Sequence, residues 1–595
     1  MFADTSFDLF APTATDGYKI GHRPLYPDGT NLTYSNGTFR SDRIFLNDKS
    51  LSRFWDSKVV WVGIQGALRE IHGLWKRSFF DKPKEAVVKR YARRMKHYLG
   101  DGRVNSECFE KLHDLGYLPI QVLSIKEGSR VNMNVPAYTV YNTHPDFYWV
   151  VNYLETIMSA IIWKIATNAT IAYEYRRTLD FWAKETGVNS AFIDVQGHDF
   201  SFRGMSGPED AARCGLGHLV VFKGTDTLPA IDYAEDMYFA DVEKEFVAAS
   251  VVATEHAVAT SNILFNVSKM LKSSSTESLG KIVDSPASEW AISQIRTAGE
   301  LQFIREVLTV KNPTGIISLV SDSFDFWKVL TEVIPALKEE ILARQPDSTG
   351  LAKTVIRPDS GDPVKVICGS AFEVKDFKES TLRSAHEAGY KYLYCPTPYG
   401  DYHEIAITGG NADVIGDLFY TKVVEPTPEM KGAVQCLWET FGGTRTSKNY
   451  KELHERVSLI YGDSITVKRA DEILRRLAMR GFASSNVVFG IGSYTYQYNS
   501  RDTLAFAIKA TVVGVEDEII ELFKAPKTEG ETVKKSAKGF LKVIKDESGN
   551  FILEQEQAMT LDSLPTSSGE LKPIYRDGVF QAEISLKEIT ETLFA

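Results

Sequence analysis

The stretch Thr354-Val-Ile-Arg-Pro-Asp-Ser-Gly361 decides the fold class, because a short apolar run passes directly into polar, turn-forming residues. Four other apolar runs end in the same way, in Asp, Gly or Ser: residues 219–222 before Asp226, 316–320 before Asp322, 457–460 before Asp463, and 486–489 before Gly490. Runs of this kind are typical of buried parallel strands when helical segments separate them, here 234–248, 327–343 and 470–481. We therefore predict an α/β fold with a (β/α) barrel-like catalytic domain over residues 186–500.

The two ends of the chain have a different pattern. Strand-like segments lie at 31–39 and 118–125 near the N-terminus, and at 509–513, 519–523, 540–544 and 551–554 near the C-terminus. Long helical segments are expected at 82–98 and 148–185. We predict a second, discontinuous α+β domain built from residues 1–185 and 501–595, and we assign about 264–290 and 364–450 to insertions in the barrel.

Composition limits the classes of function. The chain has 595 residues, with 68 Lys and Arg against 78 Asp and Glu, which gives a net charge of −10 and disfavours a general polyanion binder. The basic segment 82–98 could be a nucleic-acid patch, but a solvated helix face explains it more simply. Residues 150–163 contain Asn152 and Glu155, which favours a buried helix over a membrane span.

Cysteine usage and the first residues indicate the compartment. The five cysteines are widely spaced and contain no C-x-x-C pair, which is typical of a reduced protein. The segment 1–8 has no basic region followed by an apolar one, so we do not expect a signal peptide. We expect a cytoplasmic protein that binds neither nucleic acid nor membrane.

The polar residues after the predicted strands indicate phosphate chemistry. In barrels the reacting groups lie at the carboxyl ends of the strands. Asp322 and Asp359 are hard oxygen ligands suited to Mg²⁺, and Asp463 could bind ribose hydroxyls. The glycines at 490 and 492 could let backbone N–H groups approach a phosphate, with counter-charge from Arg501 and Lys509. The competing interpretation is that Asp, Ser and Gly here only form turns and cap helices.

Glu255-His256 is the other local signal. In isolation, a His beside an acid after a run of small residues is more often structural. Its functional interpretation is an imidazole nucleophile or acid/base, oriented by the neighbouring carboxylate and acting near the phosphates.

Nine motifs in order resemble the nicotinamide phosphoribosyltransferase family, most closely its bacterial and phage branch. They begin with Asp16-Gly-Tyr-Lys-Ile-Gly-His22 and continue through His198-Asp-Phe-Ser-Phe-Arg-Gly204. The remainder are Phe222 to Asp226, Ala253 to His256, Val320 to Asp325, Ile356 to Gly361, Gly462-Asp463, Phe489-Gly490 with Gly492, and Arg501-Asp502. Three features depart from the vertebrate-type pattern: a shorter glycine run at 492–495, about 100 residues between Gly361 and Gly462, and a long interval between His256 and Asp322.

The resemblance implies transfer of a phosphoribosyl group from 5-phosphoribosyl 1-diphosphate to nicotinamide, giving nicotinamide mononucleotide and diphosphate in NAD salvage. It implies Mg²⁺, ATP as a co-substrate that phosphorylates His256, and a homodimer with active sites at the subunit interface. The implied catalytic residues are His256, Glu255, Asp322 and Asp359, of which Asp322 and Asp359 also hold the metal. The implied nicotinamide-binding residues are Asp16, Tyr18 (from the partner subunit), Phe200, Arg203 and Asp226. The implied phosphoribosyl and diphosphate contacts are Arg40, Ser250, Ser318, Arg357, Asp359, Gly462, Asp463, Gly492, Ser493, Arg501 and Lys509.

Asp226 bears on specificity within this resemblance. An ionised carboxylate can accept a hydrogen bond from an amide NH₂ but repels the carboxylate of nicotinate, which favours nicotinamide as the substrate. Nicotinate phosphoribosyltransferase is the nearest alternative, and a non-catalytic dimeric binding protein on the same fold is an alternative from another class. A barrel aldolase or glycosidase is disfavoured because no Schiff-base Lys or paired-Glu signal is evident.

Overall fold

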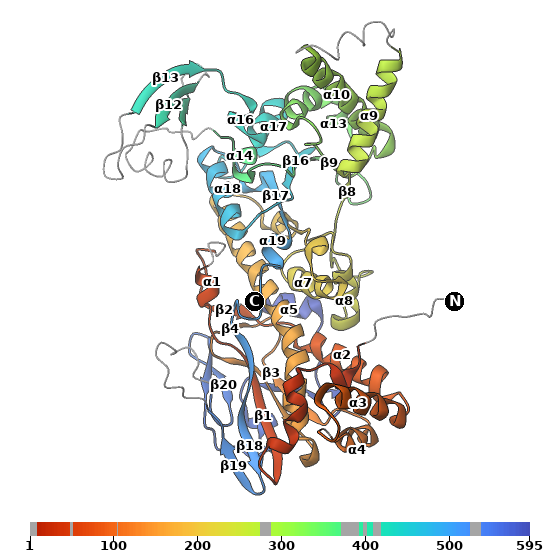
Figure 1. Ribbon diagram of the computed structural model, residues 1–595. Helices are drawn as coiled ribbons and strands as arrows, with labels where there is room; N and C mark the ends of the chain where they lie inside the picture. The colour runs from red at the N-terminus through yellow and green to blue at the C-terminus, as the bar shows by residue number, and fades with distance from the viewer. Residues whose placement is uncertain are drawn as a thin grey trace. The chain divides into compact units, whose positions relative to one another are not determined.

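The computed structural model describes residues 9–47, 52–103, 105–273, 287–370, 392–396, 402–407, 418–523 and 537–595 (Figure 1). Contacts divide the chain into a first unit of Met1–Glu174, Ser201–Ala248 and Tyr496–Ala595, and a second unit of Tyr175–Phe200 and Ala249–Thr495. The domain boundaries expected from the sequence stay a prediction. Parts of both expected insertions, and the N-terminal segment 1–8, lie outside the described residues.

The second unit contains a sheet of parallel strands. Six of its strands are hydrogen-bonded side by side in the order β6 (Gly197–Asp199), β17 (Val487–Ile491), β16 (Val457–Tyr461), β10 (Lys353–Arg357), β9 (Ile316–Val320) and β8 (Val252–Ala253). All five neighbouring pairs are parallel. From β8 to β17 the strands follow one another in chain order, which is the pattern of successive β-then-α units.

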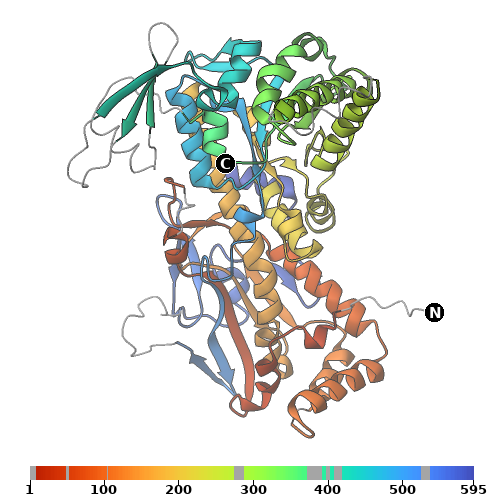
Figure 2. The ribbon, with the colours of Figure 1, turned by 45° about the horizontal axis from the view of Figure 1, so that its top comes forward.

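Helices connect these strands, as a parallel sheet requires. They are α9 (His256–Ser273) and α10 (Ala287–Glu306) after β8, α11 (Phe326–Lys328) to α13 (Lys338–Ala343) after β9, α14 (Pro363–Cys368) after β10, α18 (Val467–Met479) after β16, and α19 (Ser493–Tyr496) after β17. Helices α9 and α10 lie side by side (Figure 2). The predicted barrel-like α/β fold is confirmed. Between α14 and β16 the chain also forms a small antiparallel sheet, whose backbone is described for β11 (Tyr392–Pro396), β12 (Tyr402–Ile407) and β13 (Leu418–Val424).

Two predictions of local structure are wrong. Residues 219–222 are not a strand: helix α7 (Pro208–Leu219) reaches them, and the N–H groups of Val221 and Phe222 both bond to the carbonyl of His218. The helix expected at 234–248 is α8 (Pro229–Tyr238), which stops where Phe239 adopts a left-handed conformation with φ of 52°. The short strands β6 and β8 had not been predicted.

The first unit contains a seven-stranded sheet in which every neighbouring pair is antiparallel. Its order is β19 (Glu518–Glu521), β18 (Phe506–Val515), β1 (Thr30–Phe39), β5 (Pro136–Asn142), β3 (Ile120–Ser124), β22 (Lys572–Arg576) and β23 (Val579–Phe580). Strands from both ends of the chain therefore share one sheet, which confirms the second α+β component. The register places Asn36 opposite Lys509 and Phe39 opposite Phe506.

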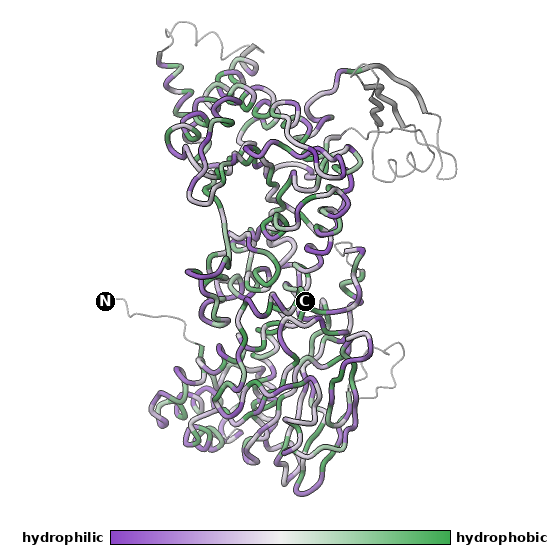
Figure 3. Tube along the Cα trace, turned by 180° about the vertical axis from the view of Figure 1, so that it is seen from behind, coloured by the Kyte–Doolittle hydropathy of each residue, from purple (hydrophilic) through white to green (hydrophobic). Residues whose placement is uncertain are grey.

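The first unit also contains the helices α2 (Ile64–Trp75), α3 (Lys84–Leu99), α4 (Glu107–Leu115), the 149–174 part of α5 (Trp149–Thr186), α7, α8 and α21 (Leu586–Phe594). Hydrophilic and hydrophobic segments alternate along many of the chain's helices, as one buried face requires (Figure 3). The basic helix α3 buries Val87, Tyr91 and Met95, and Arg90 stacks on Phe10 at 4.3 Å. Across the described ranges, no helix is long and apolar enough to cross a membrane.

Candidate active site

The parallel sheet gathers polar side chains at the carboxyl ends of its strands. The carboxyl ends of parallel strands lie at one edge of a sheet, where barrel and open α/β enzymes bind their ligands. The residues that directly follow a strand here are Phe200 after β6, Thr254 to His256 after β8, Ser321-Asp322 after β9, Pro358-Asp359 after β10, Gly462-Asp463 after β16, and Gly492-Ser493 after β17.

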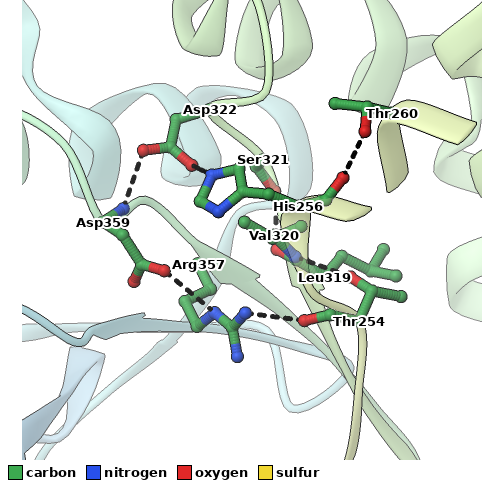
Figure 4. Close-up of polar contacts among 9 residues, drawn as sticks. All are labelled: Thr254, His256, Thr260, Leu319, Val320, Ser321, Asp322, Arg357 and Asp359. Carbon is green, nitrogen blue, oxygen red and sulfur yellow. Dashed lines mark hydrogen bonds and ion pairs between the residues drawn. The ribbon is translucent and has the colours of Figure 1, made fainter. Parts of the chain in front are cut away.

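Asp322 links three of these strand ends (Figure 4). Its Oδ1 lies 3.0 Å from Nε2 of His256, and its Oδ2 accepts a hydrogen bond of 3.0 Å from the backbone N–H of Asp359. The Asp322 side chain is 6% exposed, whereas the His256 side chain is 49% exposed. The imidazole is therefore anchored at one nitrogen by a buried carboxylate while much of the ring faces solvent, which suits a group that reacts with a bound ligand.

Arg357 is held on the opposite side of this cluster. One of its terminal nitrogens donates to the carbonyl of Thr254 at 2.6 Å, and its Nε lies 3.7 Å from Oδ2 of Asp359. Its side chain is 14% exposed. A guanidinium fixed in this way can bind a phosphate bidentately without a large ordering cost.

Thr254, which the sequence indicates only as a member of the Ala253 to His256 motif, positions neighbouring strand ends. Its hydroxyl accepts from the N–H of Val320 at 2.9 Å, its own N–H donates to the carbonyl of Ser318, and its carbonyl accepts from Arg357. It therefore ties the end of β8 to β9 and β10. A buried threonine beside a strand has no distinctive spacing, so only the neighbouring Glu255-His256 could have directed attention to it.

The two carboxylates at the centre of the cluster have opposite pKa shifts. Burial acts to raise the pKa of Asp322, but hydrogen bonds from Ser360, the Asp359 backbone and His256 outweigh it and lower the pKa. Burial raises the pKa of Asp359, with the charge of Asp322 adding to the rise and Arg357 opposing it. The pair is thus short of positive charge, and a divalent cation bound to both carboxylates would relieve the repulsion.

Phe200 lies against two glycines at the ends of neighbouring strands. A Cβ on Gly490 would come within 2.5 Å of Cδ2 of Phe200, and a Cβ on Gly462 would come within 2.8 Å of Oδ1 of Asp359. The ring of His198 lies 4.7 Å from that of Phe200. The missing side chains at 462 and 490 therefore make room for an aromatic platform and for a site carboxylate.

Among the other predicted residues of the second unit, Glu255, Ser250 and Asp463 are exposed. The Ser318 hydroxyl is buried and, within the described part of the chain, has no hydrogen-bond partner. Ser493 begins α19, and a Cβ on Gly492 would meet no atom within 4 Å.

The predicted phosphate contacts Arg40, Arg501 and Lys509 belong to the first unit and lie close enough to affect one another. Burial lowers the pKa of Arg40, and Arg501 lowers it further. Burial also lowers the pKa of Lys509, with further lowering by Arg40, Lys19 and Arg501 against an opposing effect of Glu155. Arg40 and Lys509 line a cavity of about 550 Å³ beside β1 and β18. Cations crowded in this way favour an anionic ligand.

The predicted base-binding residues Asp16, Tyr18, Arg203 and Asp226 also belong to the first unit. The Asp16 carboxylate accepts from the Thr156 hydroxyl at 2.8 Å. The side chains of Tyr18, Arg203 and Asp226 are exposed, Tyr18 by 66%.

His218 fixes the backbone just before Asp226 and had not been singled out from the sequence. It is fully buried, and its Nε2 donates to the carbonyl of Gly224 at 2.8 Å, since a carbonyl can only accept. Its Nδ1 therefore accepts from the hydroxyl of Tyr496 at 2.7 Å. A single histidine in the run before Phe222 gives no periodic signal, so its role had to come from the structure.

The chain is similar in sequence to known proteins. Residues 195–561 match the nicotinate phosphoribosyltransferase (NAPRTase) family. A nicotinamide phosphoribosyltransferase of Acinetobacter baylyi is 43% identical over 591 residues, which cover 99% of this chain and 98% of that protein. One of Mycoplasma pneumoniae is 27% identical over 528 residues, covering 87% and 92%. The solved structure of human nicotinic acid phosphoribosyltransferase aligns with a TM-score of 0.48 and 14% identity, covering 98% and 92%.

The sequence matches, together with the strand-end cluster, define the class of this chain as a phosphoribosyltransferase enzyme. Within that class, the chain belongs to the nicotinate phosphoribosyltransferase family.

We predict that Gly490→Ala displaces the Phe200 ring and destabilises the second unit by about 1–3 kcal/mol, the usual cost of overpacking. Gly492→Ala is the matched control, because its Cβ points into open space. Urea unfolding of both variants, with a crystal structure of Gly490→Ala, measures the effect. Equal stability of the two variants would show that the ring and the glycine are not in close contact.

Proposed function

We propose that the enzyme transfers the phosphoribosyl group of 5-phosphoribosyl 1-diphosphate to nicotinamide, forming nicotinamide mononucleotide and diphosphate in NAD salvage. The proposal is carried by the His256–Asp322–Asp359–Arg357 cluster at the strand ends. The full-length identity of 43% to a nicotinamide phosphoribosyltransferase supports the choice of nicotinamide.

The chemistry follows from the charges of the cluster. The bond between C1 of the ribose and the diphosphate oxygen breaks, and the pyridine nitrogen forms a new bond to C1 with its lone pair. The ribose develops positive charge in between, which nearby carboxylates stabilise, while Arg357 stabilises the departing diphosphate. Asp359 and Arg357 lie side by side, so the carboxylate can stabilise the ribose while the guanidinium stabilises the departing diphosphate.

Mg²⁺ would be held by Asp322 and Asp359 together with diphosphate oxygens. Mg²⁺ usually binds one or two carboxylates plus substrate phosphates rather than a protein cage. In keeping with this, no group of three or more His, Cys, Asp or Glu side chains in the described ranges is arranged to hold a metal ion. The ion, when bound, would neutralise charge on the leaving diphosphate.

The pyridine ring would stack on Phe200 and on Tyr18 of a second copy of the chain, with Arg203 and Asp16 beside it. Asp226 would accept a hydrogen bond from the carboxamide NH₂. The 5′-phosphate, ribose and diphosphate would contact Arg40, Ser250, Ser318, Gly462, Asp463, Gly492, Ser493, Arg501 and Lys509. The crowding of Arg40, Arg501 and Lys509 supports their part in this assignment.

His256 would accept the γ-phosphoryl group of ATP, releasing ADP, in a side reaction that improves substrate capture. The half-exposed imidazole, anchored by Asp322, supports this role. Glu255 would assist as the neighbouring carboxylate.

We further propose a cytoplasmic homodimer that binds neither nucleic acid nor membrane. In the part of the chain that the structure describes, Cys108, Cys368 and Cys436 form no disulfide, which suits a reducing compartment.

The test of the reaction supplies 5-phosphoribosyl 1-diphosphate and Mg²⁺ with nicotinamide, nicotinate or quinolinate, and identifies the mononucleotide by mass. We expect nicotinamide mononucleotide as the preferred product. Asp226→Asn should narrow the preference for nicotinamide over nicotinate by at least about tenfold, because the repelling charge is lost. If the wild type prefers nicotinate, the enzyme is a nicotinate phosphoribosyltransferase instead. If no base gives a mononucleotide, the chain is a non-catalytic binding protein.

His256→Ala should abolish the stimulation by ATP and lower turnover, measured as mononucleotide formed and ATP hydrolysed. Thr260→Ala is the control, because among the described residues its hydroxyl donates to the backbone carbonyls of His256, at 2.6 Å, and Ala257, and not to the imidazole. Retention of ATP stimulation in His256→Ala, or its loss in Thr260→Ala, would contradict the assigned role.

The proposed homodimer can be tested by mixing two variants. Tyr18→Ala and Asp322→Asn are each expected to be inactive alone, and mixing them should restore part of the activity if one intact site forms across two copies. Analytical ultracentrifugation measures the assembly. An active monomer, or mixing without recovery, would place Tyr18 in its own chain's site.

A further inference from the structure

Lys164 is a buried lysine of the first unit that none of the nine motifs includes. It lies in helix α5, and its side chain is only 4% exposed. Three oxygens surround the three hydrogens of its ammonium group. The carbonyl of Tyr496 accepts at 3.2 Å, Oε1 of Gln497 accepts at 2.9 Å, and Oδ2 of Asp210 lies 3.6 Å away. A buried ammonium needs such partners because burial removes its water.

The first link from Lys164 leads to the turn that carries Arg203. Because an ammonium only donates, Gln497 presents its oxygen to Lys164, and its Nε2 donates to the hydroxyl of Ser206 at 2.6 Å. The backbone N–H of Ser206 donates to the carboxylate of Asp210 at 3.0 Å. Ser206 comes three residues after Arg203, which lies in a short helical turn. Both partners of Ser206 are therefore partners of Lys164, so the ammonium fixes the end of this turn.

The second link leads to the backbone just before Asp226. Tyr496, whose carbonyl accepts from Lys164, donates its hydroxyl to Nδ1 of His218 at 2.7 Å. Nε2 of His218 donates to the carbonyl of Gly224, two residues before Asp226. Tyr496 and His218 are both fully buried, so water does not compete for these bonds. Lys164 is thus joined through two residues to the segment that ends in the predicted carboxamide acceptor.

Helix α5 gives this arrangement a rigid base. A Cβ on Gly217 of α7 would come within 2.8 Å of the carbonyl oxygen of Ile165 and within 2.9 Å of the backbone N of Ala169. The two helices therefore meet backbone to backbone, directly beside Lys164 on one helix and His218 on the other in sequence. A close contact of this kind leaves little room for α7 to shift against α5.

We propose that Lys164 is a positioning residue for nicotinamide, whose ammonium holds Arg203 and Asp226 in the relative placement that the base requires. This role rests on the proposed function, which assigns these two residues to the pyridine ring and its carboxamide. Lys164 acts through other residues, since its hydrogens face protein oxygens. A binding site that is loosened by about 1 Å loses its ligand even when every contact residue is present.

Lys164→Met keeps the apolar stem of the side chain and removes its donors. We expect the KM for nicotinamide to rise about tenfold, with kcat and the KM for 5-phosphoribosyl 1-diphosphate within about twofold of the wild type. A lysine that only supported the fold would instead lower the fraction of active enzyme, which reduces kcat and leaves KM unchanged. Lys184→Met is the matched control, because Lys184 is an exposed lysine of the same helix and should leave all three constants unchanged.

Hydrogen exchange measured by mass spectrometry tests the contacts without any turnover. In Lys164→Met, peptides that cover 202–210 and 218–226 should exchange faster than in the wild type, whereas those that cover 316–320 and 353–357 in the parallel sheet should not. If Lys164→Met fails to fold by circular dichroism, Gln497→Leu replaces it, because this half-buried residue carries only the first link. Gln497→Leu should raise the KM for nicotinamide about threefold and speed exchange in 202–210.

A lower kcat at unchanged KM, unchanged exchange in both segments, or an equal effect of Lys184→Met would overturn the positioning role. A wild type that forms no mononucleotide with any base would instead refute the proposed function. In that case unchanged exchange in Lys164→Met would refute the positioning role separately, because exchange does not depend on the reaction.

Discussion

The carboxylate of Asp322 makes the contacts on which the strand-end cluster of the second unit depends. Its two oxygens serve different partners, the imidazole of His256 and the backbone N–H of Asp359, each at 3.0 Å. These partners follow β8 and β10, while Asp322 follows β9 between them. One buried side chain therefore sets the relative positions of three strand ends, and its loss would leave the partly buried N–H of Asp359 without this acceptor.

The same contact explains the uneven electrostatics of the site. Because hydrogen bonds stabilise the ionised form of Asp322, its pKa falls, and its charge then adds to the burial that raises the pKa of Asp359. Arg357 offsets part of this repulsion from 3.7 Å. A site with two neighbouring carboxylates, of which Asp359 alone lies beside the guanidinium, gains from any ligand that brings additional positive charge. This is the electrostatic reason for expecting a metal with the diphosphate.

The sequence predicts the strands that carry most of this cluster and fails where burial alone gives no pattern. β9, β10, β16 and β17 are runs of β-branched residues long enough to recognise, whereas β6 and β8 have only three and two residues. The run 219–222 is equally apolar but continues a helix, because a short apolar run does not distinguish a buried helix end from a strand. Motif order also pointed to His256, Asp322 and Arg357, while Thr254 and His218 act through single contacts that no spacing reveals.

The two glycines at the carboxyl end of β17, Gly490 within the strand and Gly492 directly after it, meet two different physical requirements. From the sequence, Gly490 and Gly492 together suggested a loop that lets backbone N–H groups approach a phosphate. The structure gives Gly490 another reason, because a Cβ there would overlap Phe200 at 2.5 Å and the Cα of Gly462 at 2.7 Å. Gly492 has no neighbour within 4 Å of its missing Cβ. Gly490 is therefore required by packing of the aromatic platform, and only Gly492 keeps open space for a ligand, so substitutions at the two positions separate a folding constraint from a binding one.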